Sequence, residues 1–115
     1  MLLLGAPCIR HIGNYPSGHS TRATLYAEVL AEVFPDQRQE LLERGREIGW
    51  DRVIAGVHYP SDVSAGRVLG HELRRQMLAN EALQERMNTV KAELAKAKQL
   101  PVMASQKQPV MNTSR

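Results

Sequence analysis

Three prolines constrain the fold of this chain more than any other sequence feature. Pro16, Pro35 and Pro60 each stand at or just before the start of a stretch with helical periodicity. Proline is tolerated in the first turn of a helix but breaks a helix interior. We therefore expect consecutive helices over about residues 20–34, about residues 35–57, and from a Ser61 cap to about residue 80.

The composition of these segments favours helix packing over a β-sandwich. Tyr26, Val29, Leu30 and Val33 fall at the i, i+3, i+4 and i+7 positions of the first segment, which predicts its apolar face. Tyr, Trp and Phe supply only five side chains, so a core must come mainly from aliphatic residues and alanine. At 115 residues the chain is long enough for one domain, and we predict an all-α partial bundle.

The carboxyl-terminal part predicts one further helix and then a tail. The stripe that defines this helix alternates spacings of four and three residues, as in a packed or paired helix: Leu83, Met87, Val90, Leu94 and Ala97. Beyond Gln99 the composition becomes polar with isolated prolines. We expect an irregular lead-in over residues 1–15, a domain over 16–100 and a disordered tail over 101–115.

Charge and cysteine usage exclude several classes of function. The net charge of +3 is scattered over 15 basic and 12 acidic residues, which predicts solvated helix faces rather than a nucleic-acid surface. The same reasoning places Arg74 in solvent, and helical phase places His71 there, about 180° around its helix from Asp62. Cys8 is the single cysteine and cannot close an internal disulfide. We read neither an export signal nor a membrane span.

A short turn before the first helix suits a bound phosphate. Residues 15–20 read Tyr-Pro-Ser-Gly-His-Ser, so a glycine-containing turn opens directly into a helix. Free backbone N–H groups and the positive end of the helix dipole meet there. The alternative is an ordinary Ser cap, as found on many helices.

A second constellation consists of Arg52, His58 and Asp62. Helical phase places Arg52 and Asp62 on the apolar faces of their helices, where a charge needs a partner. His58 lies in the turn between these helices, so we expect Asp62 to accept its Nδ1 proton and leave Nε2 free to attack. One alternative is a structural salt bridge between Arg52 and Asp62. Another is a metal site formed by His19, His58 and Asp62.

These two motifs resemble the second and third motifs of the type 2 phosphatidate phosphatase and vanadium haloperoxidase superfamily. The resemblance rests on the block from Gly13 to Ser20 and on Arg52, His58 and Asp62 at their spacing. It extends from Gly13 to about Leu100 and is strongest to bacterial class A non-specific acid phosphatases. The implied fold is a helical bundle, here without its amino-terminal helices.

The resemblance implies a role for each matched residue. His58 would be the nucleophile that forms a phosphohistidine, with Asp62 as its orienting partner, and His19 would protonate the leaving group. Ser17, the Gly18 backbone N–H and Arg52 would hold the phosphoryl oxygens. The expected reaction is hydrolysis of a phosphate monoester with no cofactor and no metal, in the periplasm.

The sequence departs from the family pattern upstream of Pro16. The first motif, a Lys followed seven residues later by Arg-Pro, is absent, and Asp51 stands where the superfamily prefers Ser. We therefore expect impaired activity, uncovered apolar helix faces and possible homo-oligomers. The alternatives are an inactive helical interaction module that uses the stripe from Leu83 to Ala97, a vanadate-dependent haloperoxidase, or a lipid phosphatase.

Overall fold

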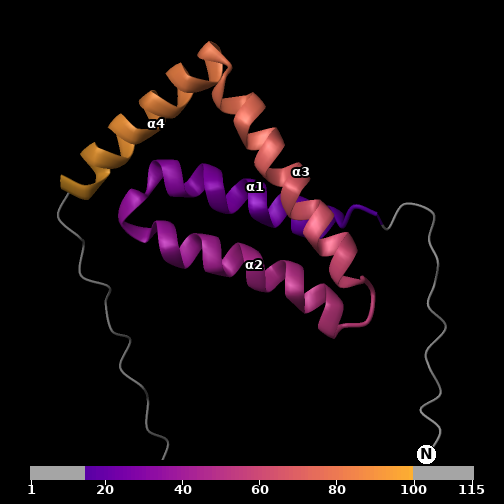
Figure 1. Cartoon of the computed structure of the whole chain (residues 1–115). Coiled ribbons are helices and arrows are strands. Elements are labelled where there is room, and N and C mark those ends of the chain that lie inside the picture. Colours follow the sequence, from indigo (N-terminus) through magenta and orange to yellow (C-terminus); the bar gives the residue numbers. More distant parts are fainter. Residues whose placement is uncertain (1–14, 100–115) are drawn as a thin grey trace, which may run out of the picture.

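The computed structural model describes residues 15–99, and these form helices joined by short turns (Figure 1). The helices are α1 (Gly18–Val33), the 3₁₀ helix η1 (Pro35–Gln37), α2 (Arg38–Ile54), α3 (Pro60–Leu78) and α4 (Glu81–Gln99). The all-α prediction is confirmed, since the described part of the chain contains no strand.

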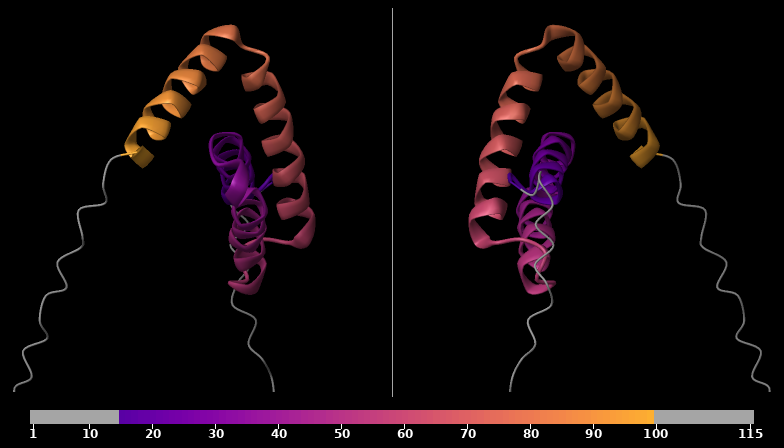
Figure 2. Two further views of the ribbon diagram at one scale, coloured as in Figure 1. Left: turned by 90° about the vertical axis from the view of Figure 1, so that its left-hand side faces the viewer. Right: turned by 90° about the vertical axis from the view of Figure 1, so that its right-hand side faces the viewer.

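The helices α1 and α2 form an antiparallel hairpin, and α3 packs across its side (Figures 1 and 2). The chain reverses sharply after α3, so that α3 and α4 form an inverted V (Figure 2). The helix α1 is central, because it packs extensively against both α2 and α3, whereas α4 makes only sparse contacts. None of the described helices is long and apolar enough to span a membrane.

The second predicted helix is shorter than expected at both ends. Pro35 opens η1, and the α-helix begins only at Arg38. At the other end α2 stops at Ile54, because Gly56 adopts a left-handed conformation with φ of 74°. The N–H groups of Gly56 and Val57 then bond to the carbonyls of Val53 and Arg52, which is the Schellman pattern of helix termination.

The start of α3 is capped differently from the prediction. Ser61 is not the cap; Tyr59 occupies that position and Pro60 is the first helical residue. The carboxylate of Asp62 accepts a hydrogen bond from the backbone N–H of Tyr59 at 2.9 Å. A negative charge in the first turn also interacts favourably with the helix dipole. Asp62 therefore stabilises the start of this helix.

The predicted apolar face of α1 was wrong. Tyr26 and Leu30 are 60% and 42% exposed, and the buried face of α1 is instead made of small and polar side chains. It includes Ser20, Thr21, Ala23, Thr24, Ala27, Glu28 and Ala31.

Glycines on the neighbouring helices explain this choice of face. A Cβ on Gly45 of α2 would lie 2.9 Å from Ala27 Cβ, and one on Gly66 of α3 would lie 2.7 Å from the Ser17 carbonyl oxygen. The helices therefore approach too closely for any larger residue at these points. Close approach selects the small side chains of α1 for the interface and leaves Tyr26 and Leu30 outside.

The apolar stripe of α4 is only partly buried. Met87 is 9% exposed, but Val90 is 44% exposed and Ala97 is also exposed. The predictions for Cys8, most of the lead-in and the tail over 101–115 concern residues outside the described part of the chain.

Candidate active site

The two predicted motifs meet where the amino-terminal ends of α1 and α3 come together. The turn after α2 brings His58 to the start of α3, and α1 begins beside it. The N–H of Ser17 donates to the carbonyl oxygen of Asp62 at 3.0 Å. The Ser20 hydroxyl donates to the carbonyl oxygen of Val63 at 2.7 Å. Segments more than 40 residues apart in the sequence thus form one cluster.

His58 and Asp62 form the pair that the sequence predicts. His58 Nδ1 lies 3.3 Å from Asp62 Oδ2, and the two side chains are only 9% and 12% exposed. Because the carboxylate is an acceptor, the pair places the imidazole proton of a neutral His58 on Nδ1. The lone pair is then on Nε2, which is the state required of a nucleophile.

The start of α1 presents backbone donors and a histidine. Ser17 is the N-cap, fully buried, and its Oγ accepts from the Ser20 N–H at 3.3 Å. Its hydroxyl donates no hydrogen bond within the described residues, and because the residue is fully buried, the phosphoryl contact that the resemblance implies for it stays a prediction. Gly18 and His19 are exposed, and no atom beyond the chain neighbours and the helix's own backbone lies within 4 Å of where a Gly18 Cβ would stand. A ligand can therefore approach the Gly18 backbone closely.

Arg52 is half-buried in the last turn of α2, and its Nε is buried without a hydrogen-bond partner among the described residues. No carboxylate of the described chain forms an ion pair with it. A partly buried guanidinium without an anion is costly. An oxyanion of the phosphate class would supply the missing acceptors in the geometry that arginine favours.

The surroundings of His19 change its protonation. Partial desolvation lowers the pKa of His19 below its ordinary value of 6.5, and the positive charges of Arg52 and Arg22, together with His58, lower it further. The influence of Arg52 and His58 on this pKa shows that the two motifs share one electrostatic environment. A histidine with a lowered pKa gives up its proton more readily, which suits a proton donor at mildly acidic pH.

The metal-site alternative finds no support in the geometry of this cluster. Among residues 15–99, no group of three or more His, Cys, Asp or Glu side chains is arranged to hold a metal ion. Two histidines, a carboxylate paired with one of them, and an arginine beside free backbone donors are instead a set of groups that could serve phosphoryl transfer.

Sequence reasoning missed a second charged cluster, on the far part of the α1–α3 interface. Glu28 is only 8% exposed and pairs with His71 and with Arg74, whose Nε lies 3.4 Å away. Arg74 also pairs with Glu32. His71 is exposed as predicted, but the prediction that Arg74 is simply solvated was wrong. The signal was available, since Glu28 shares the helical face of Ala27, Thr24 and Ala31.

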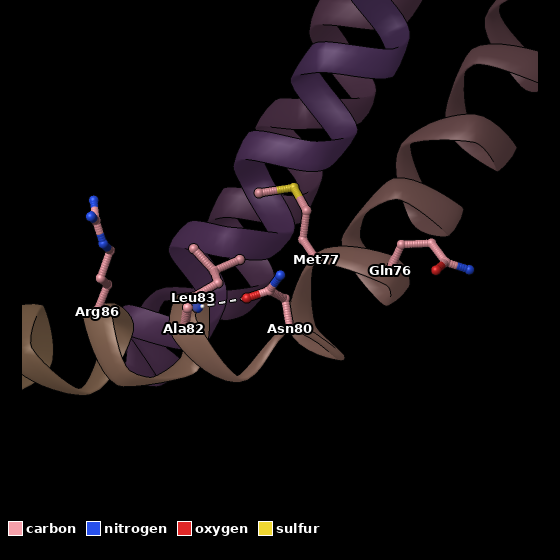
Figure 3. Close-up of a pocket in the computed structure, with 6 residues that line it drawn as sticks. All are labelled: Gln76, Met77, Asn80, Ala82, Leu83 and Arg86. Atoms are coloured by element: carbon pink, nitrogen blue, oxygen red, sulfur yellow. Dashed lines mark hydrogen bonds between the residues drawn. The ribbon is translucent and has the colours of Figure 1, made fainter.

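A shallow hollow at the corner between α3 and α4 lies well away from the cluster. It has a volume of about 540 Å³, and Met77 and Leu83 contribute apolar side chains to it (Figure 3). Asn80 caps α4 there by accepting from the Leu83 N–H at 3.1 Å. Met77 is separated from Asp62 by about 22 Å along the axis of α3, so this hollow belongs to a different part of the molecule.

Comparison with known proteins agrees with the chemistry of the cluster. The sequence pattern of the PAP2 superfamily matches residues 6–73, which include all six predicted site residues. A non-specific acid phosphatase of Salmonella typhimurium is 44% identical over 86 residues, covering 75% of this chain and 34% of the relative. One from Providencia stuartii is 38% identical over 86 residues, covering 75% of this chain and 35% of the relative.

The chain is also similar to a relative that is named for a lipid substrate. A lipid A 1-phosphatase of Rhizobium etli is 40% identical over 57 residues, covering 50% of this chain and 25% of the relative. The chain spans about a third of the length of the acid phosphatases that it matches.

Proposed function

This chain belongs to the PAP2 superfamily, and from that premise we propose that it hydrolyses phosphate monoesters through a phosphohistidine intermediate. The observation that carries the proposal is the buried His58–Asp62 pair, with a 3.3 Å contact, in one cluster with the unpaired Nε of Arg52 and the start of α1. Two relatives that share this part of the sequence are named non-specific acid phosphatases.

The first chemical step is attack by His58 on phosphorus. The lone pair on Nε2 forms the new P–N bond as the P–O bond to the leaving group breaks, while Asp62 stabilises the positive charge that develops on the imidazole. Protonated His19 gives its proton to the departing oxygen. Arg52, Ser17 and the Gly18 N–H stabilise the negative phosphoryl oxygens throughout.

The second step returns the cluster to its starting state. Water attacks the phosphohistidine and gives a proton to His19, the P–N bond breaks, and its electron pair returns to His58. Phosphate is released. In this scheme the described side chains supply the nucleophile, the acid and base, and the positive charge, so no metal is required.

Turnover of para-nitrophenyl phosphate at mildly acidic pH, without added metal, tests the proposal. We compare the purified chain with His58→Ala and with the control His71→Ala, which removes a histidine of α3 that lies outside the candidate active site. Activity in the chain and in the control, together with loss of at least about 10³-fold in His58→Ala, supports the proposal. Equal turnover in His58→Ala contradicts it.

Chemical trapping gives a second measurement of the same proposal. A rapid quench during turnover should leave a phosphoryl group on the protein that is stable in alkali and labile in acid, as expected for phosphohistidine. The label should be absent from His58→Ala and present in His71→Ala.

The Rhizobium relative motivates a lipid phosphate as the second candidate substrate. Comparing short-chain phosphatidate with para-nitrophenyl phosphate separates the two, because a lipid phosphatase should show a higher kcat/KM for the lipid. The bacterial acid phosphatase relatives also lead us to propose a periplasmic location, which fractionation of expressing cells tests.

A further inference from the structure

Ser20 lies behind the candidate active site, where three helices meet. It is 1% exposed, and its hydroxyl donates to the Val63 carbonyl oxygen at 2.7 Å. A Cβ on Gly49 of α2 would lie 3.1 Å from Ser20 Oγ, and one on Gly66 of α3 would lie 2.8 Å from Ser20 Cβ. A single hydroxyl therefore occupies the contact between α1, α2 and α3.

This hydroxyl ties together the backbone segments that carry the chemistry. Ser20 follows His19 directly, and Val63 follows Asp62 directly. The neighbouring Ser17 N–H to Asp62 carbonyl bond, at 3.0 Å, forms a second tie between the same segments. These two hydrogen bonds therefore join the backbone next to His19 to the backbone next to the His58–Asp62 pair.

We propose that Ser20 is a positioning residue, whose buried hydroxyl holds His19 at the correct distance from His58. The inference rests on the proposed function, in which His19 protonates the leaving group. Ser20 itself donates nothing to the substrate, because its one hydroxyl proton is already given to the Val63 carbonyl oxygen. Its contribution is made through the relative placement of α1 and α3.

Thr24 provides a matched control on the same helix face. It lies one turn further along α1, is 7% exposed, and packs against Gly70 of α3, where a Cβ would be 2.8 Å from Thr24 Cβ. Thr24→Ala thus removes buried atoms from the same interface away from the cluster. Ser20→Ala removes only the hydroxyl, and Ser20→Thr restores a donor.

Leaving-group dependence distinguishes positioning from a general loss of folded protein. An alkyl phosphate needs protonation of its leaving oxygen, whereas para-nitrophenolate leaves without it. We expect Ser20→Ala to lower kcat/KM for the alkyl phosphate about 10-fold more than for para-nitrophenyl phosphate, since small displacements of a catalytic group have large effects. Ser20→Thr should recover part of this difference, and Thr24→Ala should lower both values equally.

Each kinetic outcome decides one of the two proposals. If Ser20→Ala lowers kcat/KM for both substrates by the same factor, or changes neither value, the positioning role is overturned while the proposed function stands. If the chain shows no turnover, or His58→Ala retains it, the proposed function is wrong.

An NMR titration measures the position of His19 without turnover. Desolvation and the charges of Arg52 on α2, Arg22 on α1 and His58 in the turn hold the pKa of His19 low. If the Ser20 hydroxyl fixes His19 among these groups, Ser20→Ala should raise that pKa toward its ordinary value, and Thr24→Ala should leave it unchanged. An identical His19 pKa in all three folded proteins would count against the positioning role.

Discussion

The two ends of α3 are built in opposite ways. At its start, Val63 is 1% exposed, and the carbonyls of Asp62 and Val63 accept hydrogen bonds from α1. At its end, Met77 is 36% exposed beside an open hollow, and α4 has few neighbours. The close packing on α1 thus begins at the candidate site and continues along α3 through Gly70 to the Glu28–Arg74 pair, and only the last turn of α3 is open. The arm made by the end of α3 and α4 contributes little to the geometry of the candidate site.

Of the variants that test this difference between the two ends of α3, Asp62→Asn should have the largest effect. The amide cannot stabilise a positive His58 as a carboxylate does, and it can favour the wrong imidazole tautomer, so we expect kcat to fall about 10³-fold. Glu72→Gln, at an exposed carboxylate paired with Arg75 further along α3, is the control and should keep full activity. Similar turnover in the two variants would contradict the prediction that only the start of α3 takes part in catalysis.

The next largest effect should come from Gly66→Ala. The added methyl would stand 2.7 Å from the Ser17 carbonyl oxygen, and this neighbour is backbone that cannot rotate away. We expect the free energy of unfolding to fall by about 3 kcal/mol, as for severe overpacking. Urea denaturation measures it, and a variant as stable as the parent would show that α1 and α3 separate easily.

A matched pair of valines compares the two regions directly. Val63→Ala removes methyl groups from the buried start of α3, whereas Val90→Ala removes the same groups from a side chain that is 44% exposed on α4. We expect a loss of about 2 kcal/mol for the first and a change within about 0.5 kcal/mol for the second. Equal losses would mean that the arm is as well packed as the site.

The smallest effect concerns pH. His19 can donate only while protonated, so hydrolysis of an alkyl phosphate should decline as pH rises through its lowered pKa. Desolvation is the main cause of the lowering, and the charges of Arg52 and Arg22 add to it. Arg22→Gln should therefore raise the pKa of His19 slightly and move the decline in kcat/KM to higher pH. Arg75→Gln, remote from the cluster, should leave the profile in place.

The sequence was sufficient to predict the contact between His58 and Asp62 and the helical class. The spacing from Arg52 to His58 and Asp62, interrupted by Pro60, determines which side chains meet in the turn between two helices. Local rules therefore work here, because the cluster depends on helix ends and short turns. The roles of its residues in catalysis stay predictions until the variants above are measured.

The buried face of α1 could not be predicted by hydrophobic periodicity. That pattern selects Tyr26 and Leu30, but the structure buries Ser20 and Thr24 because Gly66 and Gly70 allow closer approach than large side chains permit. The feature of the sequence that could have indicated this close approach is a pair of glycines spaced four residues apart on each neighbouring helix, Gly45 and Gly49 on α2 and Gly66 and Gly70 on α3. The cap of α3 was also missed, because Ser61 suits a cap but Pro60 is already the first helical residue, which makes Tyr59 the cap.

One carboxylate in this molecule serves two purposes, and this affects how related sequences should be interpreted. Asp62 accepts from the Tyr59 N–H that opens α3 and from the imidazole of His58. A descendant that no longer turns over substrate would still be under selection to keep Asp62 for the integrity of its helix. Retention of His58 is therefore the more informative marker of a surviving enzyme, and a catalogue of relatives sorted by Asp62 alone would count inactive proteins among the active ones.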